Sequence, residues 1–223
     1  MTATPFQDAG FHVVPDVLGA PACAAVIDSL PDNAAQSRSL LAQPWCARLA
    51  RQLQGHAALA GAIASDAVAV QCTYFEKSRD QNWLVALHQD LSIPVRARLA
   101  HADLTGWSHK EGQWYVQPPP ALLDELVAVR LHLDACGADD GPLQVVAGSH
   151  RHGRLPAVQQ AALAQAGRTP CLVDQGGVLL MKPLLLHGSS KATGSGRRRV
   201  LHFLFGPPTL PAGLAWPATA AFE

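Results

Sequence analysis

Apolar residues recur along the chain in two periods that predict two kinds of element. Residues 20–30 and 45–60 have the spacing of amphipathic helices, most clearly at Trp45, Leu49 and Leu53. Elsewhere, short runs rich in apolar and β-branched residues predict strands. These runs are 10–18, 67–75, 83–88, 127–134, 143–146, 170–173, 178–186 and 198–205. So many short strands imply a sandwich or a barrel, with helices packed on the outside of a sheet.

Two stretches lack a regular pattern. Between Asp90 and the strand near Val127, only residues 121–126 carry a weak helical signal. Long irregular connections are more often functional lids than passive links, so we expect residues 91–120 to form a substrate lid. The alternative is that their large aromatic rings only fix a long loop to the barrel. The Pro-rich stretch 206–223 is expected to be an irregular tail that wraps the surface.

The composition indicates one domain that covers residues 1–223. Hydrophobic residues make up 48% of the chain and charged residues 15%, which excludes a disordered protein and allows a large core. The 17 basic and 17 acidic residues cancel, which disfavours nucleic acids and anionic membranes as partners. No apolar run reaches 18 residues, and the first basic residue is Arg38. We therefore expect neither a transmembrane span nor a signal peptide, and a cytoplasmic protein.

The cysteines and the missing motifs exclude several other classes. Five scattered cysteines without a Cys-x-x-Cys pair argue against a disulfide framework or a thiolate zinc site. We expect them to be reduced and mostly buried. The chain lacks a Gly-x-Ser-x-Gly elbow, a Walker phosphate loop and a dinucleotide-binding glycine motif. Hydrolases with a serine elbow, nucleotide-binding proteins and dehydrogenases are therefore disfavoured.

The triplet His88-Gln89-Asp90 follows an apolar strand and is the first candidate for metal chemistry. In an extended segment, residues two apart point the same way, so the imidazole of His88 and the carboxylate of Asp90 can converge on one ion. His187 ends the apolar run 178–186 and could supply a third ligand. Two histidines and one carboxylate form the facial triad of non-haem Fe(II) sites, which leaves positions open for a co-substrate and oxygen. The alternative for His187 is a core histidine at a strand end.

Arg198 lies eleven residues after His187, within the triplet Arg197-Arg198-Arg199 that begins the last predicted strand. A guanidinium is a natural bidentate partner of a carboxylate, so an arginine that points inward beside a metal site suggests an acidic co-substrate. Strand alternation places Arg198 and Arg199 on opposite faces, so all three arginines cannot enter one pocket. The alternative is a solvated strand start.

These motifs, in this order and spacing, resemble the phytanoyl-CoA dioxygenase-like family of Fe(II)/2-oxoglutarate dioxygenases. The matching segments are Gly10-Phe11-His12-Val13-Val14, His88-Gln89-Asp90, the loop from Asp140 to His150, His187-Gly188-Ser189 and Arg198. Two loop residues depart from the family pattern, because Asp140 and Ala147 stand where asparagine and proline are usual. The carboxylate of Asp90 is retained, whereas the related halogenases lack it. Halogenation is therefore disfavoured.

The resemblance implies a mainly β fold with flanking helices, a double-stranded β-helix or jelly roll like that of the cupins. It also implies His88, Asp90 and His187 as ligands of Fe(II). Arg198 and Ser189 would hold the distal carboxylate of 2-oxoglutarate.

Four further residues are assigned to the pocket. Gln71, on the strand before the His-x-Asp strand, is placed at the 2-oxoglutarate site by the same resemblance. Trp83, just before the metal strand, is a candidate substrate contact, with plain core packing as the alternative. Trp107 and Trp114, on the expected lid, are candidate substrate contacts as well.

Several other polar residues receive no role in the chemistry. Residues 76–80 are expected to form a solvated turn, and residues 150–154 to serve a surface loop. Arg130, His132 and Asp134 share one strand face, so they either line the cavity or form an ordinary hydrogen-bonded face.

The sequence therefore predicts an Fe(II)- and 2-oxoglutarate-dependent oxygenase that uses O2 and most simply hydroxylates a small molecule, with release of succinate and CO2. Two alternatives stay open. One is a metal-dependent hydrolase that uses the same His/Asp/His site, and the other is a non-catalytic binding protein of the same fold. The fold hosts many substrates, so it does not identify this one.

Overall fold

A computed structural model describes residues 5–31 and 37–218, so the last part of the expected tail, 219–223, lies outside the described residues. The strands are β1 (Phe11–Val14), β2 (Val68–Lys77), β3 (Val85–His88), β4 (Ile93–Val95), β5 (Thr105–Lys110), β6 (Gln113–Gln117), β7 (Val127–His132), β8 (Leu143–Val145), β9 (Thr169–Cys171), β10 (Val178–Met181), β11 (His187–Ser189) and β12 (Arg198–Gly206). The α-helices are α1 (Pro5–Ala9), α2 (Ala20–Asp28), α3 (Pro44–Gln54), α4 (Pro120–Asp124) and α5 (Ala157–Gln165).

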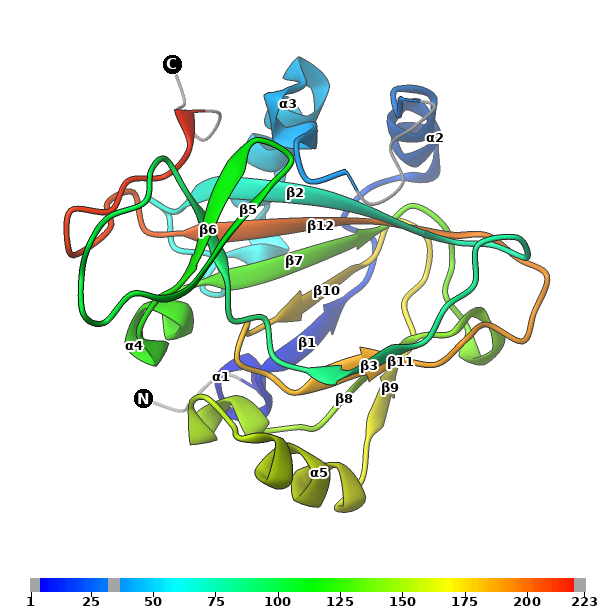
Figure 1. The fold of residues 1–223 in the computed structure, drawn as a ribbon. Helices are drawn as coiled ribbons and strands as arrows, with labels where there is room; N and C mark the ends of the chain where they lie inside the picture. Colours follow the sequence, from blue (N-terminus) through cyan, green and yellow to red (C-terminus); the bar gives the residue numbers. More distant parts are fainter. Residues whose placement is uncertain (1–4, 32–36, 219–223) are drawn as a thin grey trace.

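The strands form three antiparallel sheets within the described residues (Figure 1). The large sheet has the order β1-β10-β7-β12-β2, the small sheet has the order β3-β11-β8-β9, and a third sheet has the order β4-β6-β5. The large and small sheets are the two layers of a jelly roll. Helices α2 and α3 lie beyond the large sheet and α5 lies beyond the small one (Figure 1). The predicted mainly β jelly roll with flanking helices is confirmed.

Strand β12 shows how the alternation of side chains divides the large sheet into two faces. Leu201, Phe203 and Phe205 are buried in the core formed with the helices, where Leu49 and Leu53 of α3 join them. The alternate residues of β12 include arginine and histidine, and they face the opposite layer of the jelly roll. The helices therefore cover an apolar face of the large sheet, while the other face is free to carry polar chemistry.

The structure shortens two of the predicted elements. The run 178–186 is a strand only as far as Met181, because Pro183 cannot donate a ladder hydrogen bond. The helix predicted over 45–60 ends at Gln54, followed by Gly55 as its C-cap. These breaks turn the chain at the ends of both elements, so the buried apolar residues beyond them belong to separate segments.

The expectation that 91–120 is irregular is wrong, because this segment contains β4, β5 and β6. Strands β5 and β6 form a hairpin around Glu111 and Gly112, which have φ angles of 51° and 77°. Two consecutive positive φ angles define the tight turn that suits the twist of a hairpin. A glutamate is unusual in this conformation, and its presence hid the turn in the sequence.

Three further expectations concern the termini, the cysteines and the membrane. The described part of the tail lacks regular strands or α-helices after β12, as predicted, and Trp216 packs into the core. All five cysteines are buried and free. Among the described helices, none is both long enough and apolar enough to cross a membrane.

Candidate metal centre and adjoining cavity

The pairing of β3 with β11 brings the predicted metal ligands together. His88 ends β3 and is the direct cross-strand partner of His187 in β11, with their ring centroids 4.3 Å apart. Nε2 of His88 lies 3.6 Å from Oδ1 of Asp90, and Nε2 of His187 lies 3.7 Å from Oδ2. Within residues 5–31 and 37–218, these three side chains are the ones whose ligand atoms gather closely enough to hold a metal ion.

The second nitrogen of each histidine ring is engaged by a backbone carbonyl. Nδ1 of His88 lies 2.9 Å from the oxygen of Ala86, and Nδ1 of His187 lies 2.8 Å from the oxygen of Leu185. A carbonyl oxygen can only accept, so each Nδ1 carries a proton and each Nε2 is the ring nitrogen left to bind a metal ion. Such bonds fix ring orientation in metal sites. Two imidazoles and one carboxylate without a thiolate are a donor set that suits Fe(II).

The protonation states of Asp90 and His187 suit this cluster to bind a cation. Burial alone would raise the pKa of the Asp90 carboxyl, but His187 and His88 outweigh that effect and hold the pKa below its usual range. The Asp90 side chain is 38% exposed, and it lines the cavity described below. Burial lowers the pKa of His187 to about 4. The carboxylate is therefore ionised and this imidazole neutral near pH 7, as metal binding requires.

The middle residue of the motif holds the metal strand in place. Gln89 Nε2 donates to the backbone oxygens of Gly153 and Leu184 at 2.8 and 2.6 Å. Its Oε1 accepts from the backbone nitrogen of Leu155 at 2.8 Å. These bonds tie the His-x-Asp segment to the chain leading into β11 and to the segment 153–155. This role of Gln89 was not predicted from the sequence, although a buried polar residue between two ligands needs partners.

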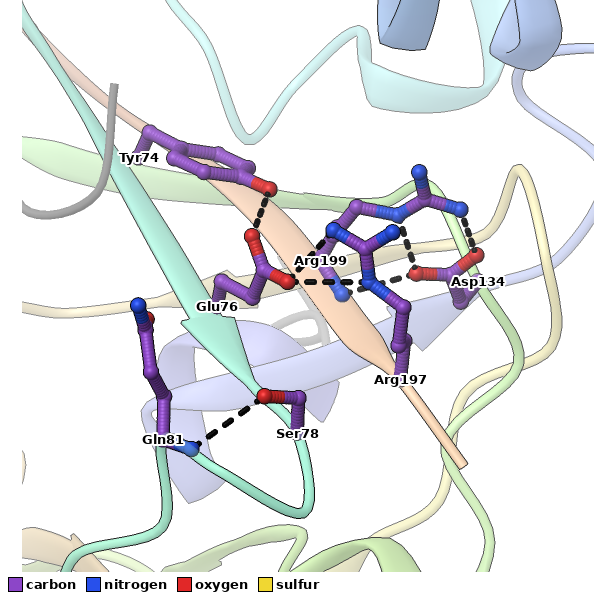
Figure 2. Close-up of polar contacts among 7 residues, drawn as sticks. All are labelled: Tyr74, Glu76, Ser78, Gln81, Asp134, Arg197 and Arg199. Atoms are coloured by element: carbon purple, nitrogen blue, oxygen red, sulfur yellow. Dashed lines mark hydrogen bonds and ion pairs between the residues drawn. The ribbon is translucent and has the colours of Figure 1, made fainter. Parts of the chain in front are cut away.

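The structure separates the three consecutive arginines by face. Arg197 donates from Nε and Nη2 to Oε1 of Glu76 at 2.9 and 2.6 Å (Figure 2). Arg199 donates from Nε and Nη2 to the two carboxylate oxygens of Asp134 at 2.8 and 2.7 Å (Figure 2). Arg198 instead lines the cavity and is only 5% exposed. Of the three, Arg198 is therefore the arginine available to a ligand in the cavity.

The two outer pairs should differ in their effect on stability. The Arg199–Asp134 side chains are 16% and 18% exposed, whereas Arg197 is 58% exposed. We expect Arg199→Leu to lower the free energy of unfolding by about 1–3 kcal/mol, the range for hydrogen bonds to charged groups and their unpaired partners. Arg197→Leu should cost about 1 kcal/mol or less. Urea unfolding measures both, and a larger loss in Arg197→Leu would contradict this assignment.

A second cation lies beside Arg198 at one end of the cavity. Lys77 is the cross-strand partner of Arg198, and its Nζ donates to Ser189 Oγ at 2.9 Å and to the oxygen of Ser190 at 2.5 Å. Arg198 Nη1 donates to the oxygen of Gly141, while its Nε has no hydrogen-bond partner in the part of the chain that the structure describes. Among residues 5–31 and 37–218, neither cation forms an ion pair with a carboxylate. This end of the cavity is suited to a carboxylate ligand.

The expectation of a solvated turn over 76–80 is wrong for Lys77. Strand β2 continues to this residue, and its side chain is 1% exposed. Burial, followed by the charge of Arg198, lowers the pKa of Lys77 to about 8. The long register of β2 against β12 causes the burial, because it places Lys77 opposite Arg198. A register between distant strands is not visible in the local sequence.

The metal cluster and the Arg198 end belong to one cavity of about 460 Å³. Among the other predicted pocket residues, Gln71 and Trp83 line it. Gln71 Nε2 donates to Thr73 Oγ1 at 2.8 Å, which holds its side chain on the face of the large sheet that carries Arg198. The size is typical of a pocket that encloses a small molecule.

Trp107 and Trp114 are not among the residues that line this cavity. Their rings contact each other edge to face, with centroids 6.3 Å apart, and pack against an apolar cluster beneath the third sheet. Lys110 and Tyr115 of the same hairpin line the cavity instead. The segment 91–120 thus contributes a wall of the cavity, but through side chains other than the two tryptophans.

The other polar residues considered from the sequence also divide into those that line the cavity and those that do not. Arg130 lines the cavity, whereas Asp134 is turned to Arg199. His150 Nε2 lies 3.1 Å from the oxygen of Gln7 and helps to hold the N-terminal segment. The prediction that His150 serves a loop rather than the metal agrees with this contact.

A comparison with protein-family models decides the family. The model described as phytanoyl-CoA dioxygenase (PhyH) matches residues 6–200. The chain belongs to this family. The PhyH match spans every element from β1 to the start of β12, and so includes the His88, Asp90, His187 cluster and Arg198. None of the curated protein sequences compared with the chain matches it.

Solved structures share the fold of this PhyH domain. Iron-bound HygX from Streptomyces hygroscopicus is 21% identical with a TM-score of 0.62, over 95% of this chain and 93% of that one. The non-heme monooxygenase ThoJ is 19% identical with a TM-score of 0.67, over 98% and 85%. The 2-oxoglutarate-dependent epimerase SnoN from nogalamycin biosynthesis is 15% identical with a TM-score of 0.59, over 96% and 83%. At these identities the likeness establishes the fold.

The family and the cluster together define the kind of enzyme. A dioxygenase family and a His–Asp–His group beside an open cavity identify an oxygenase that works with iron and 2-oxoglutarate. The resemblance predicted from the sequence is confirmed at this level.

Proposed function

We propose that this protein hydroxylates a small molecule, with His88, Asp90 and His187 as ligands of Fe(II) and Arg198 as the anchor of 2-oxoglutarate. The observation that carries the proposal is that both groups open into one cavity. A metal cluster at one place and paired cations at another match the two ends of an acidic co-substrate that chelates iron.

The chain's own residues would bind and orient the reactants. When bound, Fe(II) and 2-oxoglutarate supply the oxidation: O2 is consumed, 2-oxoglutarate loses CO2 to become succinate, and the substrate gains one oxygen atom in a C–H bond. Arg198 and the Ser189 hydroxyl would hold the distal carboxylate, with Lys77 as a second cation beside them. Gln71 and Trp83 would shape the remaining wall. Because this end is buried, each charge-assisted hydrogen bond is strengthened by the low local dielectric.

The β5–β6 hairpin would act as a wall that limits access to the metal. Tyr115 lines the cavity from β6, Ile93 from the start of β4, and Leu91 from the segment before it. Exclusion of water protects a reactive site from side reactions. We also propose that the hairpin moves as a lid. Hydrogen exchange over 91–120, measured with and without substrate, would test this movement.

The hydrolase alternative uses the same metal ligands but leaves Arg198 and Lys77 without a task. The reaction outcome is a finer question, because the structural neighbours include both the monooxygenase ThoJ and the epimerase SnoN. Product analysis therefore has to distinguish hydroxylation from other oxidations.

The test is the stoichiometry of co-substrate turnover. We expect the purified protein with Fe(II) and O2 to convert 2-oxoglutarate into succinate and CO2, slowly alone and faster with substrate. Under nitrogen, addition of 2-oxoglutarate to the Fe(II) protein should produce the visible absorption of the chelate. Turnover that proceeds without oxygen or 2-oxoglutarate would support the hydrolase, and absence of both chelation and succinate would support a binding protein.

A further inference from the structure

The charge of the cavity exceeds what the metal site and the co-substrate require. Five of its lining residues are cationic and one, Asp90, is a carboxylate. The cations are Arg38, Lys77, Lys110, Arg130 and Arg198. Arg38 is matched by Glu111, whose Oε1 lies 2.9 Å from its Nη1. Even with a dianionic 2-oxoglutarate bound, Arg130 and Lys110 remain without an anion, and Fe(II) adds two further positive charges.

Arg130 is the most deeply placed of these unmatched cations. It stands in the middle of β7, in the large sheet, and is only 6% exposed. The strand register sets it beside His202 of β12, and its guanidinium lies over the ring of Phe75 with the central carbon 5.4 Å from the centroid. Because Arg130 belongs to the lining of the cavity, its buried guanidinium faces the space beside the metal cluster.

No carboxylate satisfies this guanidinium within the described structure. Its side chain donates from Nη1 to Nδ1 of His202 at 2.9 Å, and its Nε has no partner among the described residues. Arginine cannot accept a hydrogen bond, so Nδ1 of His202 must present a lone pair, and that ring is neutral. Burial and the charge of Arg130 lower the pKa of His202 to about 3, which agrees with a neutral ring.

A buried guanidinium without a counter-charge is costly, and an anionic ligand would supply that charge. Burial, followed by the charge of Arg198, lowers the pKa of Arg130 only to about 10, so it stays protonated at neutral pH. Asp90 is the carboxylate that interacts with it favourably, but that carboxylate is committed to the metal in the proposed site. An anion from a ligand is therefore the missing partner.

We propose that the substrate is a small organic acid whose carboxylate binds Arg130, a subsite separate from the Arg198 end. This rests on the proposed function, since it presumes that 2-oxoglutarate occupies the Arg198 end. The rest of the wall suits an apolar body, because Phe75, Leu126 and Leu204 line the same cavity. Lys110, exposed on the hairpin, lines the entrance and would attract the same anion.

The test uses matched probes that differ only in charge. The probes are phenylacetate, phenylacetamide and 2-phenylethylamine, and octanoate, octanamide and octylamine. Each is titrated into the anaerobic Fe(II)·2-oxoglutarate protein, and binding is followed by the change in the chelate absorption and by thermal stabilisation. We expect each acid to bind about tenfold or more tightly than its amide, and the amine more weakly still.

Variants then locate the subsite. Arg130→Leu and the milder Arg130→Gln should remove the preference for the acid while 2-oxoglutarate affinity stays within about twofold. Lys110→Gln, at an exposed position, should weaken the acids by a smaller factor and increasingly so at low salt. Arg48→Gln, on the exposed side of α3, is the matched control and should change neither affinity.

Four results would overturn the proposal. Equal binding of acid, amide and amine, or no binding by any acid, would exclude an anionic substrate. Acid preference that survives in both Arg130 variants would place the subsite elsewhere. A loss of 2-oxoglutarate affinity in Arg130→Gln would show that this arginine serves the co-substrate's metal-side carboxylate. Failure of the proposed function is distinguishable, because the wild-type protein would then form no chelate absorption before any probe is added.

Discussion

Replacement of Asp90 or His187 by alanine should abolish stoichiometric Fe(II) binding and 2-oxoglutarate turnover while leaving the fold intact. Loss of a hydrogen-bond partner of a metal ligand already costs ~10–100-fold in metal affinity or activity. Removal of one of only three protein ligands should therefore cost more than that. Neither side chain is part of the hydrophobic core. Asp90 lines the cavity, and His187 forms its side-chain hydrogen bond with the nearby carbonyl of Leu185. Anaerobic Fe(II) titration with metal analysis measures the first effect, and succinate formation the second.

The chain contains a matched control for these variants. His101 and Asp103 form a second His-x-Asp pair, with Nδ1 and Oδ2 3.9 Å apart and both side chains exposed. His101→Ala and Asp103→Ala remove the same chemical groups, and we expect iron content and turnover to stay at wild-type values. Normal iron binding in both Asp90→Ala and His187→Ala would show that the metal assignment is wrong.

The second His-x-Asp pair also shows that the sequence motif could not by itself decide which pair binds the metal. His-x-Asp occurs three times, at 88–90, 101–103 and 132–134. In the third pair, Asp134 is paired with Arg199, and His132 is buried with neither ring nitrogen hydrogen-bonded to any described residue. The motif alone therefore does not identify the metal site. The pair at 88–90 was identified by its position before a distant His-Gly-Ser segment and Arg198. In the fold, the pairing of β3 with β11 brings His88 next to His187.

The layers of the fold were predictable because each strand carries its own pattern. Alternation along β12 correctly placed Arg198 on the face opposite Arg199, and the structure adds the carboxylates that hold the outer arginines, Glu76 and Asp134 (Figure 2). The alternative of a solvated strand start is excluded for Arg198, because this residue is buried.

Side chains whose role depends on pairing between distant strands were not predictable. Lys77 follows a glutamate and precedes a polar turn, so its local sequence indicates a solvated position. Its burial comes from ten residues of β2 paired against β12. For the same reason the sequence left two possibilities open for Arg130, a place in the cavity wall or on an ordinary hydrogen-bonded strand face. Only the neighbouring strands decide which face of β7 meets the cavity.

Replacement of Arg198 by leucine should weaken 2-oxoglutarate binding by about 10- to 100-fold, because a charge-assisted pair with a carboxylate is worth ~1.5–3 kcal/mol. Lys77→Met should weaken it less, since Lys77 already donates to Ser189 and Ser190 and would share the carboxylate. Fe(II) binding should be retained in both variants, because neither residue belongs to the metal cluster. Titration of 2-oxoglutarate into the anaerobic Fe(II) protein, followed by the chelate absorption, gives the affinities.

Two arginine variants make this prediction specific to position. Arg197→Leu removes an equal charge one residue away, but from the Glu76 pair outside the cavity, and should leave the affinity unchanged. Arg198→Lys keeps the charge but loses the planar two-point contact, so its affinity should fall between those of the wild type and Arg198→Leu. An unchanged affinity in Arg198→Leu, together with a loss in Arg197→Leu, would mean that the carboxylate binds on the outer face of the sheet. Loss of Fe(II) binding in Arg198→Leu would instead mean that this arginine supports the metal cluster rather than the co-substrate.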